Sequence, residues 1–371
     1  MQSFLMILLM MRHFVCCWLN LALNRSQFCF MDIWVKIAIP GGKYILEREL
    51  FIDACHGRNY CQAPPRDAFN EWKKKRLLLY IASIMSIQIQ DNKSLQPFNT
   101  FGMNVLARYL VTVSGSDEVR ASLQWATTQR LQSFILGGGS NILFTKDVDG
   151  LVIQNGIKGI EKVFEDEEHV YLKVGGGETW HGFVLYCLGH DYAGVENLAL
   201  IPGLAGASPM QNIGAYGVEI KEVFHELTAI HRATLEEVHF SNKDCEFGYR
   251  ESVFKHRYKD QFIITDVTYK LSKKSAFKVA YGAIKQELEK AGVQNLSIQA
   301  IANAVIAIRS SKLPDPKEIG NAGSFFKNPS VSKEQFEILK LKFPEIVAYE
   351  NPDHTMKLAA GWLIEQGGLK G

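Results

Sequence analysis

Phe134-Ile135-Leu136-Gly137-Gly138-Gly139-Ser140-Asn141 joins a short apolar run directly to three consecutive glycines. The apolar run predicts a buried strand. Consecutive glycines let the backbone bend so that several N–H groups converge on one anion, and Ser140 and Asn141 add hydrogen-bonding side chains. The spacing G-x-G-x-x-G and the ending Lys-Ser/Thr are absent, which excludes the two common phosphate-binding fingerprints. The segment therefore fits either an anion-binding nest or a plain turn.

The segments around this strand alternate between strand and helix patterns, which is typical of a mixed α and β protein. Short apolar or alternating runs predict strands at residues 151–153, 170–174, 262–264 and 267–271. Apolar residues at helical spacing predict helices at residues 119–126, 180–189 and 298–309, and a fourth after Ser332. A capping box is expected at Ser114-x-x-Asp117, and Ser332-x-x-Gln335 is expected to open the fourth helix.

The composition is that of a soluble globular protein, with 47% hydrophobic and 22% charged residues. A length of 371 residues suggests two or three domains. Residues 1–84 carry 11 Lys/Arg against 6 Asp/Glu, whereas the remainder carries 30 against 33. The main body is therefore mildly acidic. Since it also lacks a basic stripe with interleaved aromatics, we expect no nucleic-acid partner.

Cysteine and histidine usage limits the possible chemistry of the body. Five of the seven cysteines lie in residues 1–84, and Cys187 and Cys245 are far apart without C-x-x-C spacing. This pattern predicts no disulfide framework and favours a cytoplasmic location. The ten histidines form neither an H-E-x-x-H motif nor a Cys/His cluster, so no metal site is predicted.

Residues 1–84 differ in character from the rest. Their first 30 residues are rich in Met, Leu, Phe and Cys, but Arg12 and His13 interrupt the apolar run in its middle. That arrangement fits neither a signal peptide nor a membrane span. Residues 31–84 show no sustained strand or helix period, and Met85 begins an ordinary polar stretch. We expect Met85 to be the natural start and residues 1–84 to be translated upstream sequence; a membrane-associating extension is the alternative.

Two irregular segments suggest ligand contacts. Pro202 to Gly217, within IPGLAGASPMQNIGAYG, is rich in small residues and amides, as close approach to a planar heteroaromatic ring requires. A structural loop is the alternative. Gly320-Asn321-Ala322-Gly323-Ser324-Phe325-Phe326-Lys327-Asn328-Pro329 suits a backbone bent close to a ligand with one hydroxyl directed at it, or an ordinary glycine-rich turn.

Cations and a tyrosine add further candidates. Phe247-Gly248-Tyr249-Arg250 offers a permanent cation for developing negative charge, although a solvated surface pair is the commoner use of such an arginine. Arg309 and Lys312 stand at a helix end before Pro314, where they fit phosphate binding or helix-dipole compensation. Tyr281 fits a lid over a ligand or a place in the core.

In this order, the segments resemble the UDP-N-acetylenolpyruvoylglucosamine reductase (MurB) family, in its subtype with a substrate-covering tyrosine loop. The resemblance starts near Leu95 and runs to Gly371, and residues 1–84 lie outside it. It passes through LQPFNTFG, LGGGSN, ENLALIPGLAGASPMQNIGAYG, FGYRES, RSSKLPDP, GNAGSFFKNP and KLAAGWLIEQ. So many collinear motifs make the resemblance specific.

The resemblance implies an α+β, FAD-binding fold of the vanillyl-alcohol-oxidase (PCMH) type, with two FAD subdomains and a third α/β domain for substrate. The expected boundaries are residues 85–156, 157–308 with the tyrosine-loop insert, and 309–371. It also implies that NADPH reduces FAD, whose N5 delivers hydride to the enolpyruvyl double bond of a UDP-sugar in peptidoglycan synthesis. A cytoplasmic monomer without membrane contact in its body is expected.

The resemblance also assigns residue roles. Ser324 matches the proton donor, and Arg250 matches the cation that stabilises the carbanionic enol. The positions that hold the UDP-sugar, or line the same cleft, are Tyr216, Tyr249, Tyr281, Arg309, Lys312 and Asn328. The FAD contacts are Gly137, Gly138, Gly139, Ser140, Asn141, Ser208, Ile213 and Gly214.

The family continues beyond Leu369-Lys370-Gly371 to a motif that carries a catalytic glutamate, and this sequence stops at Gly371. We therefore expect the sequence to be a fragment, with an impaired natural product as the alternative. The rival functions are a non-catalytic flavin-binding remnant and another oxidase of the same flavin fold.

Overall fold

The structure, a computed structural model, describes residues 34–39, 43–48, 87–280, 282–324, 326–351 and 353–369. The chain divides into two compact units, Met1–Pro65 and Arg66–Gly371. No helix within the described ranges is both long and apolar enough to cross a membrane.

In the first unit, β1 (Trp34–Ile39) pairs antiparallel with β2 (Lys43–Arg48). The expectation that residues 31–84 have no strand pattern is wrong here. Both segments contain β-branched or aromatic residues that favour strands, namely Trp34, Val35, Ile37, Ile39, Tyr44 and Ile45, and Pro40-Gly41-Gly42 between them has the composition of a turn. The other predictions for residues 1–84 fall outside the described residues.

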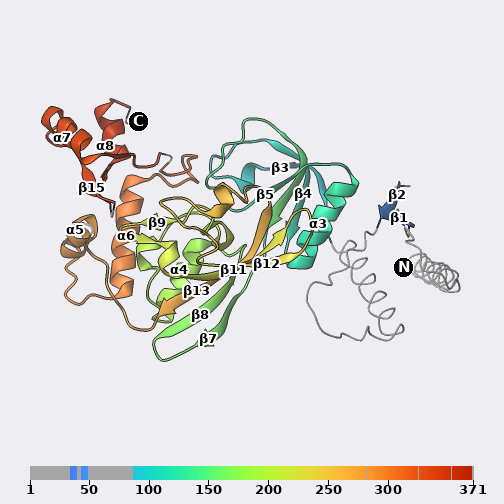
Figure 1. Cartoon of the computed structure of the whole chain (residues 1–371), viewed down its shortest axis with the longest axis horizontal. Coiled ribbons are helices and arrows are strands. Elements are labelled where there is room, and N and C mark those ends of the chain that lie inside the picture. The colour runs from blue at the N-terminus through green and yellow to red at the C-terminus, as the bar shows by residue number, and fades with distance from the viewer. Residues whose placement is uncertain are drawn as a thin grey trace, which may run out of the picture. The chain divides into compact units, whose positions relative to one another are not determined.

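The second unit begins with a four-stranded sheet of order β3-β4-β6-β5 (Figure 1). Its strands are β3 (Gln90–Ser94), β4 (Leu106–Val113), β5 (Ser133–Leu136) and β6 (Val148–Asn155). β3 runs antiparallel to β4, whereas β4 and β5 run parallel to β6. The strands predicted at residues 134–136 and 151–153 are confirmed as β5 and β6.

Helix α3 (Ser116–Thr128) joins this sheet to the next one. Its buried residues Val119, Leu123 and Ala126 share an apolar cluster with Ile230 and Ile263 of the second sheet. The capping box predicted at Ser114-x-x-Asp117 is wrong, because the helix starts after an extended Gly115 and Asp117 lies inside its first turn. The Ser114 backbone N–H and hydroxyl instead donate to Glu118 Oε2, at 2.7 and 2.9 Å.

The second sheet has five antiparallel strands in the order β12-β11-β13-β8-β7. They are β7 (Ile160–Glu165), β8 (His169–Gly175), β11 (Phe224–His231), β12 (Glu237–Ser241) and β13 (Phe262–Ser272). Residues 262–264 and 267–271 were expected to be separate strands, and both belong to β13. The polar residues between them have partners: Thr265 Oγ1 donates to Thr228 O at 3.1 Å, and Asp266 lies 3.5 Å from Lys173 Nζ.

The largest core lies against one face of this sheet. Helix α4 (Trp180–Gly189), predicted from its apolar stripe, packs Trp180 and Phe183 against the buried ring of Tyr269 on β13. Cys187 and Cys245 are buried free thiols there. Burial raises the pKa of the Cys187 thiol, and it raises the pKa of Cys245 to about 12.

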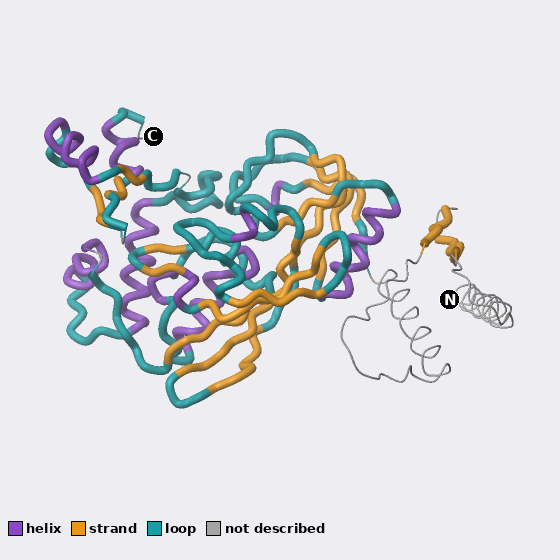
Figure 2. The backbone as a smooth tube through the Cα atoms, in the orientation of Figure 1, coloured by secondary structure: helices purple, strands orange, loops and turns teal. Residues whose placement is uncertain are grey.

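Helix α6 (Ile298–Lys312) packs on α5 (Gly282–Lys290), as Figure 2 shows. It continues three residues past the predicted end at Arg309. Pro314 ends it, because a proline disfavours helical backbone in the preceding residue, and Leu313 is extended.

A three-stranded sheet of order β14-β16-β15 follows, with β14 (Ser330–Val331), β15 (Ala348–Glu350) and β16 (Met356–Leu358). It is accompanied by α7 (Lys333–Lys342) and α8 (Ala360–Gln366), near the C-terminal end in Figure 1. The helix predicted to open at Ser332 is confirmed as α7, and Ser332 and Gln335 form a capping box at its start. Phe336, Ile346 and Leu358 form a small core of their own.

The remaining elements within the described residues are short. They are the two-stranded ladder of β9 (Gly214–Ala215) with β10 (Val218–Glu219), and five 3₁₀ turns: η1 (Gln96–Phe98), η2 (Glu196–Leu198), η3 (Ala205–Ala207), η4 (Ile220–Glu222) and η5 (Val253–Lys255).

One close backbone contact fixes the loop after β5. Gly139 has φ +60°, and a Cβ added there would lie 2.0 Å from the carbonyl oxygen of Phe98. Thr100 N donates to Gly139 O at 3.1 Å across the same contact. Only glycine fits this position, since a side chain would meet backbone atoms that have no room to move.

The substitution Gly139→Ala should lower the free energy of unfolding by about 2–4 kcal/mol, because it combines a left-handed backbone with a steric clash. Denaturant unfolding followed by circular dichroism measures this change. Gly115→Ala is the matched control, since Gly115 is extended and a Cβ there would meet nothing within 4 Å. Equal stability of the two variants would show that the loop can yield at Gly139.

Candidate functional site

The two glycine-rich loops predicted to bind the cofactor lie side by side. A Cβ on Gly138 would lie 3.0 Å from Gly203 Cα, and one on Gly203 would lie 3.1 Å from Ser140 Oγ. Asn141 Nδ2 donates to Gln211 Oε1 at 3.3 Å. The loop after β5 and the irregular stretch from Pro202 onward therefore form one surface.

The loop after β5 has backbone N–H donors that are not used by other described residues. Within the described part of the chain, the backbone amides of Gly138, Gly139, Ser140 and Asn141 donate no hydrogen bond to another residue. Consecutive unpaired amides on a glycine loop are the donor set that binds phosphate oxygens. These residues therefore fit the diphosphate of a dinucleotide such as FAD.

Buried side chains anchor the stretch from Ser208 to Gly214. Ser208 is buried, and its hydroxyl lies 2.9 Å from the hydroxyl of Tyr269, which donates to Ala205 O at 3.2 Å. Burial raises the pKa of Tyr269, so this hydroxyl stays protonated. Ile213 is also buried. The buried side chains of Ser208 and Ile213 therefore support the loop from its interior side.

Arg250 is anchored on the same stretch. Its backbone has φ +56°, and its guanidinium donates to the carbonyl oxygens of Asn212, at 3.3 Å, and Gly214. A Cβ on Gly214 would lie 2.8 Å from the backbone oxygen of Val218 and 2.6 Å from Arg250 Nη1, so the loop favours glycine there. Glu219 Oε1 lies 3.7 Å from the same nitrogen. An arginine has five N–H donors, so Arg250 keeps donors for a ligand.

Tyr249 lies between two cations. Its ring centre is 5.2 Å from Arg250 Cζ and 4.7 Å from Lys357 Nζ, which belongs to β16. This contact connects the C-terminal sheet to the Arg250 loop. Lys357 was not among the predicted site residues, although it is the first residue of the quoted motif KLAAGWLIEQ.

Arg309 and Tyr216 form a half-buried pair. Arg309 Nε donates to Leu200 O at 3.2 Å, and its guanidinium is hydrogen-bonded to the Tyr216 side chain. Burial lowers the pKa of Arg309 and raises the pKa of Tyr216, and in each case the partner opposes the shift. Lys312 is exposed one turn further along α6.

Ser324 lies on a segment held at both ends. At one end, Asn321 N donates to Thr100 O at 3.1 Å, and Thr100 in turn contacts Gly139. At the other end, Lys327 Nζ pairs with the carboxylate of Glu251, the neighbour of Arg250. The segment therefore connects the glycine loop to the arginine loop, and Ser324 itself is exposed.

Glu251 and Lys327 were not predicted as site residues, although both lie inside the quoted motifs FGYRES and GNAGSFFKNP. Lys327 and His256, whose Nε2 is 2.7 Å from Glu251 Oε2, hold the pKa of Glu251 below its usual range. Opposite charges in two of the quoted motifs hint at an ion pair, but only the folded structure shows that these two residues meet.

The two remaining predicted residues are Asn328, which the structure describes, and Tyr281, which it does not. Asn328 Oδ1 accepts from Ala360 N at 3.0 Å, so the side chain supports the start of α8. Tyr281 lies outside the described residues. The insert before it is held by buried Asn197, whose Nδ2 donates to Lys278 O at 2.9 Å and Tyr216 O at 3.2 Å.

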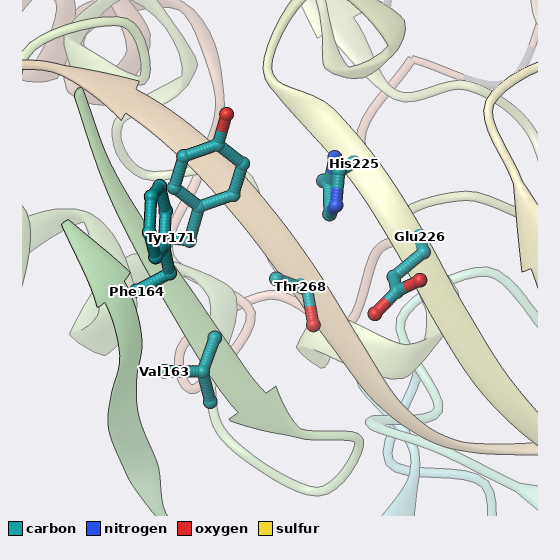
Figure 3. Close-up of a pocket in the computed structure, with 6 residues that line it drawn as sticks. All are labelled: Val163, Phe164, Tyr171, His225, Glu226 and Thr268. Atoms are coloured by element: carbon teal, nitrogen blue, oxygen red, sulfur yellow. The ribbon is translucent and has the colours of Figure 1, made fainter. Parts of the chain in front are cut away.

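A separate hollow lies on the outer face of the five-stranded sheet (Figure 3). Side chains alternate along β8, so that Val170 and Leu172 face the core and Tyr171 faces outward. The hollow is lined by Val163, Phe164, Tyr171, His225, Glu226 and Thr268. None of them is a residue predicted to bind cofactor or substrate.

Comparisons with known proteins agree with this geometry. Residues 107–238, which include both glycine-rich loops, match the family model described as an FAD binding domain. The chain is 49% identical over 286 residues to the UDP-N-acetylenolpyruvoylglucosamine reductase of Flavobacterium johnsoniae, covering 77% of this chain and 84% of that protein. It is 48% identical over 287 residues to the enzyme of the same name from Pseudomonas syringae pv. syringae, with the same coverage.

Among solved structures, the UDP-N-acetylenolpyruvylglucosamine reductase of Thermus caldophilus superposes with a TM-score of 0.50 and 22% identity, over 77% of this chain and 81% of that one. The expected α+β FAD-binding fold is thereby confirmed. Nearly half of the aligned residues are identical over most of the relatives' length, so this chain belongs to the UDP-N-acetylenolpyruvoylglucosamine reductase family.

Proposed function

We propose that this chain reduces UDP-N-acetylglucosamine enolpyruvate to UDP-N-acetylmuramate, a step of peptidoglycan precursor synthesis, with FAD as cofactor and NADPH as reductant. The observation that carries the proposal is the segment of Ser324, tied at one end to the glycine loop and at the other to the loop of Arg250. FAD, when bound, supplies the hydride.

The chain's contribution to cofactor binding is a set of backbone donors. Gly137, Gly138, Gly139, Ser140 and Asn141 would hold the cofactor's phosphates through amides that have no other partner among the described residues. Ser208, Ile213 and Gly214 would form the adjoining wall, because that stretch packs directly on the loop.

Arg250 stabilises the negative charge that spreads onto the substrate carboxylate after hydride arrives. A permanent cation is effective there only if it is already in place when charge develops. The carbonyl oxygens of Asn212 and Gly214 provide that placement, since they fix the guanidinium on a loop beside the cofactor.

Ser324 donates the proton from Oγ to the carbanionic carbon of the substrate. A serine hydroxyl is a weak acid, so its contribution depends on placement close to that carbon. The glycines at 320 and 323 allow such placement: a Cβ on Gly320 would lie 2.4 Å from Phe101 O, and Gly323 has φ +66°.

The UDP-sugar is held by charged and aromatic side chains. Arg309 and Lys312, one turn apart on α6, would bind its phosphates, with Tyr216, Tyr249, Tyr281 and Asn328 around the sugar. The proposed domain boundaries are residues 85–156, 157–308 and 309–371. We also propose that the protein acts as a cytoplasmic monomer.

The direct experiment is to purify the chain, record its flavin absorbance, and follow NADPH oxidation with and without the enolpyruvyl substrate. We expect a yellow protein that consumes NADPH and substrate in equal amounts. Flavin without substrate-dependent turnover would instead identify a non-catalytic binding remnant. NADPH consumption that ignores the UDP-sugar would identify another flavin oxidase.

Replacing the proton donor tests the role of Ser324. Ser324→Ala should lower kcat by about a hundredfold or more, the usual contribution of a general acid, while flavin content stays unchanged. Steady-state kinetics measure this. Ser330→Ala, an exposed serine at the start of β14, is the control and should keep kcat near the original value. A similar kcat for both variants would remove Ser324 from the mechanism.

Replacing the cation tests Arg250. Arg250→Met should lower kcat/KM by about 10²–10³, the typical cost of losing one stabilising donor at a developing anion. Arg257→Met is matched, because Arg257 is an exposed arginine that pairs with Glu246 at 2.9 Å and also lies over a tyrosine ring. The role of Arg250 is refuted if the two variants lose activity equally.

A further inference from the structure

Leu200 lies next to Arg309, a proposed ligand of the UDP-sugar, and its backbone conformation is unusual for a leucine. It directly precedes the glycine-rich stretch that begins with Ile201-Pro202-Gly203, and its backbone has φ +56°. A left-handed backbone is unfavourable for leucine and persists only where its surroundings hold it. The contacts that hold Leu200 are therefore informative.

His181 holds Leu200 from one side. The Leu200 backbone N–H donates to His181 Nδ1 at 3.1 Å, and His181 is the second residue of α4. Because Nδ1 accepts this bond, the ring carries its proton on Nε2 and is neutral. Burial lowers the pKa of His181, which agrees with a neutral ring.

Arg309 holds the same residue from the other side. Its Nε donates to the Leu200 carbonyl oxygen at 3.2 Å, and its guanidinium also bonds the Tyr216 side chain. The donor and the acceptor of Leu200 are thus each used by a side chain, one from α4 and one from α6. A change in the Leu200 backbone alters the anchor of Arg309.

We propose that His181 is a positioning residue for UDP-sugar binding: by accepting the Leu200 N–H, it fixes the carbonyl that orients Arg309 toward the substrate phosphates. This inference rests on the proposed function, because it takes Arg309 as a substrate ligand. His181 need not touch substrate or FAD, and its effect passes through one peptide segment.

The histidine could instead serve only the packing of α4, and the two roles predict different kinetics. Loss of packing would lower stability, flavin content and kcat together. Loss of a positioning bond would weaken substrate binding alone. An asparagine separates the two further, since its Oδ1 lies at nearly the same distance from the backbone as His Nδ1 and can accept the same bond.

The experiment compares His181→Leu, His181→Asn and the control His190→Leu in the full FAD-loaded chain. His190 also lies on α4, at its C-cap, where its Nδ1 contacts Tyr186 O of the same helix at 2.8 Å. Calorimetry without NADPH measures the Kd of the enolpyruvyl substrate, and steady-state kinetics give KM and kcat. Flavin absorbance and thermal melting monitor the fold.

We expect His181→Leu to raise Kd and KM about tenfold with kcat within about twofold, as for the loss of one hydrogen bond that supports a charged ligand. His181→Asn should restore most of the affinity, and His190→Leu should leave it unchanged. The inference is overturned if His181→Leu binds normally, if asparagine binds as weakly as leucine, or if flavin content and kcat fall together with affinity. Absence of binding by the unmodified chain would refute the proposed function itself.

Discussion

The contact of Gly139 with the backbone of Phe98 and Asn99 is the constraint on which the proposed site depends. It places the loop after β5 against the segment 98–102, and that segment in turn binds Asn321 through Thr100 O. Backbone thus packs on backbone at two successive contacts, with glycine at Gly139 and Gly320 where a Cβ would clash. Such contacts have little freedom, because neither partner can change rotamer. The loop proposed to bind the cofactor and the segment of the proposed proton donor, far apart in sequence, are thereby fixed together before any ligand binds.

The opposite end of the Ser324 segment is held more weakly, by charge. Glu251 and Lys327 are partly exposed, and an exposed ion pair adds little net free energy because water solvates both ions when they separate. The ion pair instead determines which residue of the segment faces the Arg250 loop. Lys357 over Tyr249 adds a second contact of the same kind from β16. The glycine end of the segment is therefore fixed by backbone contacts, whereas the charged end is held by side chains that can change rotamer.

Local patterns predicted the elements well and their junctions poorly. The apolar stripe at Trp180–Leu188, the strands β5, β6 and β8, and the helix start at Ser332 follow from patterns within one segment, where the sequence carries the physical cause. The errors arose where a partner elsewhere decides the outcome. Thr265 and Asp266 remain in β13 because Thr228 and Lys173 satisfy them, and Ser114 bonds Glu118 instead of capping with Asp117. The site residues came from collinear motifs, whereas Glu251–Lys327 and His181–Leu200 are visible only once the chain is folded.

Arg309 and Ser324 differ in burial, and this difference bears on which of them is in place before substrate binds. Arg309 is largely shielded from water and already bonded to Leu200 and Tyr216, so its orientation is established before substrate arrives. Ser324 is exposed, and water can compete with substrate for its hydroxyl. In the proposed mechanism, a substrate that covers Ser324 excludes this water from the proton transfer. Binding energy from the UDP-sugar phosphates would then be spent on closing the site around the reacting carbon, which would link affinity at Arg309, the proposed phosphate ligand, to the rate of the proposed proton transfer from Ser324.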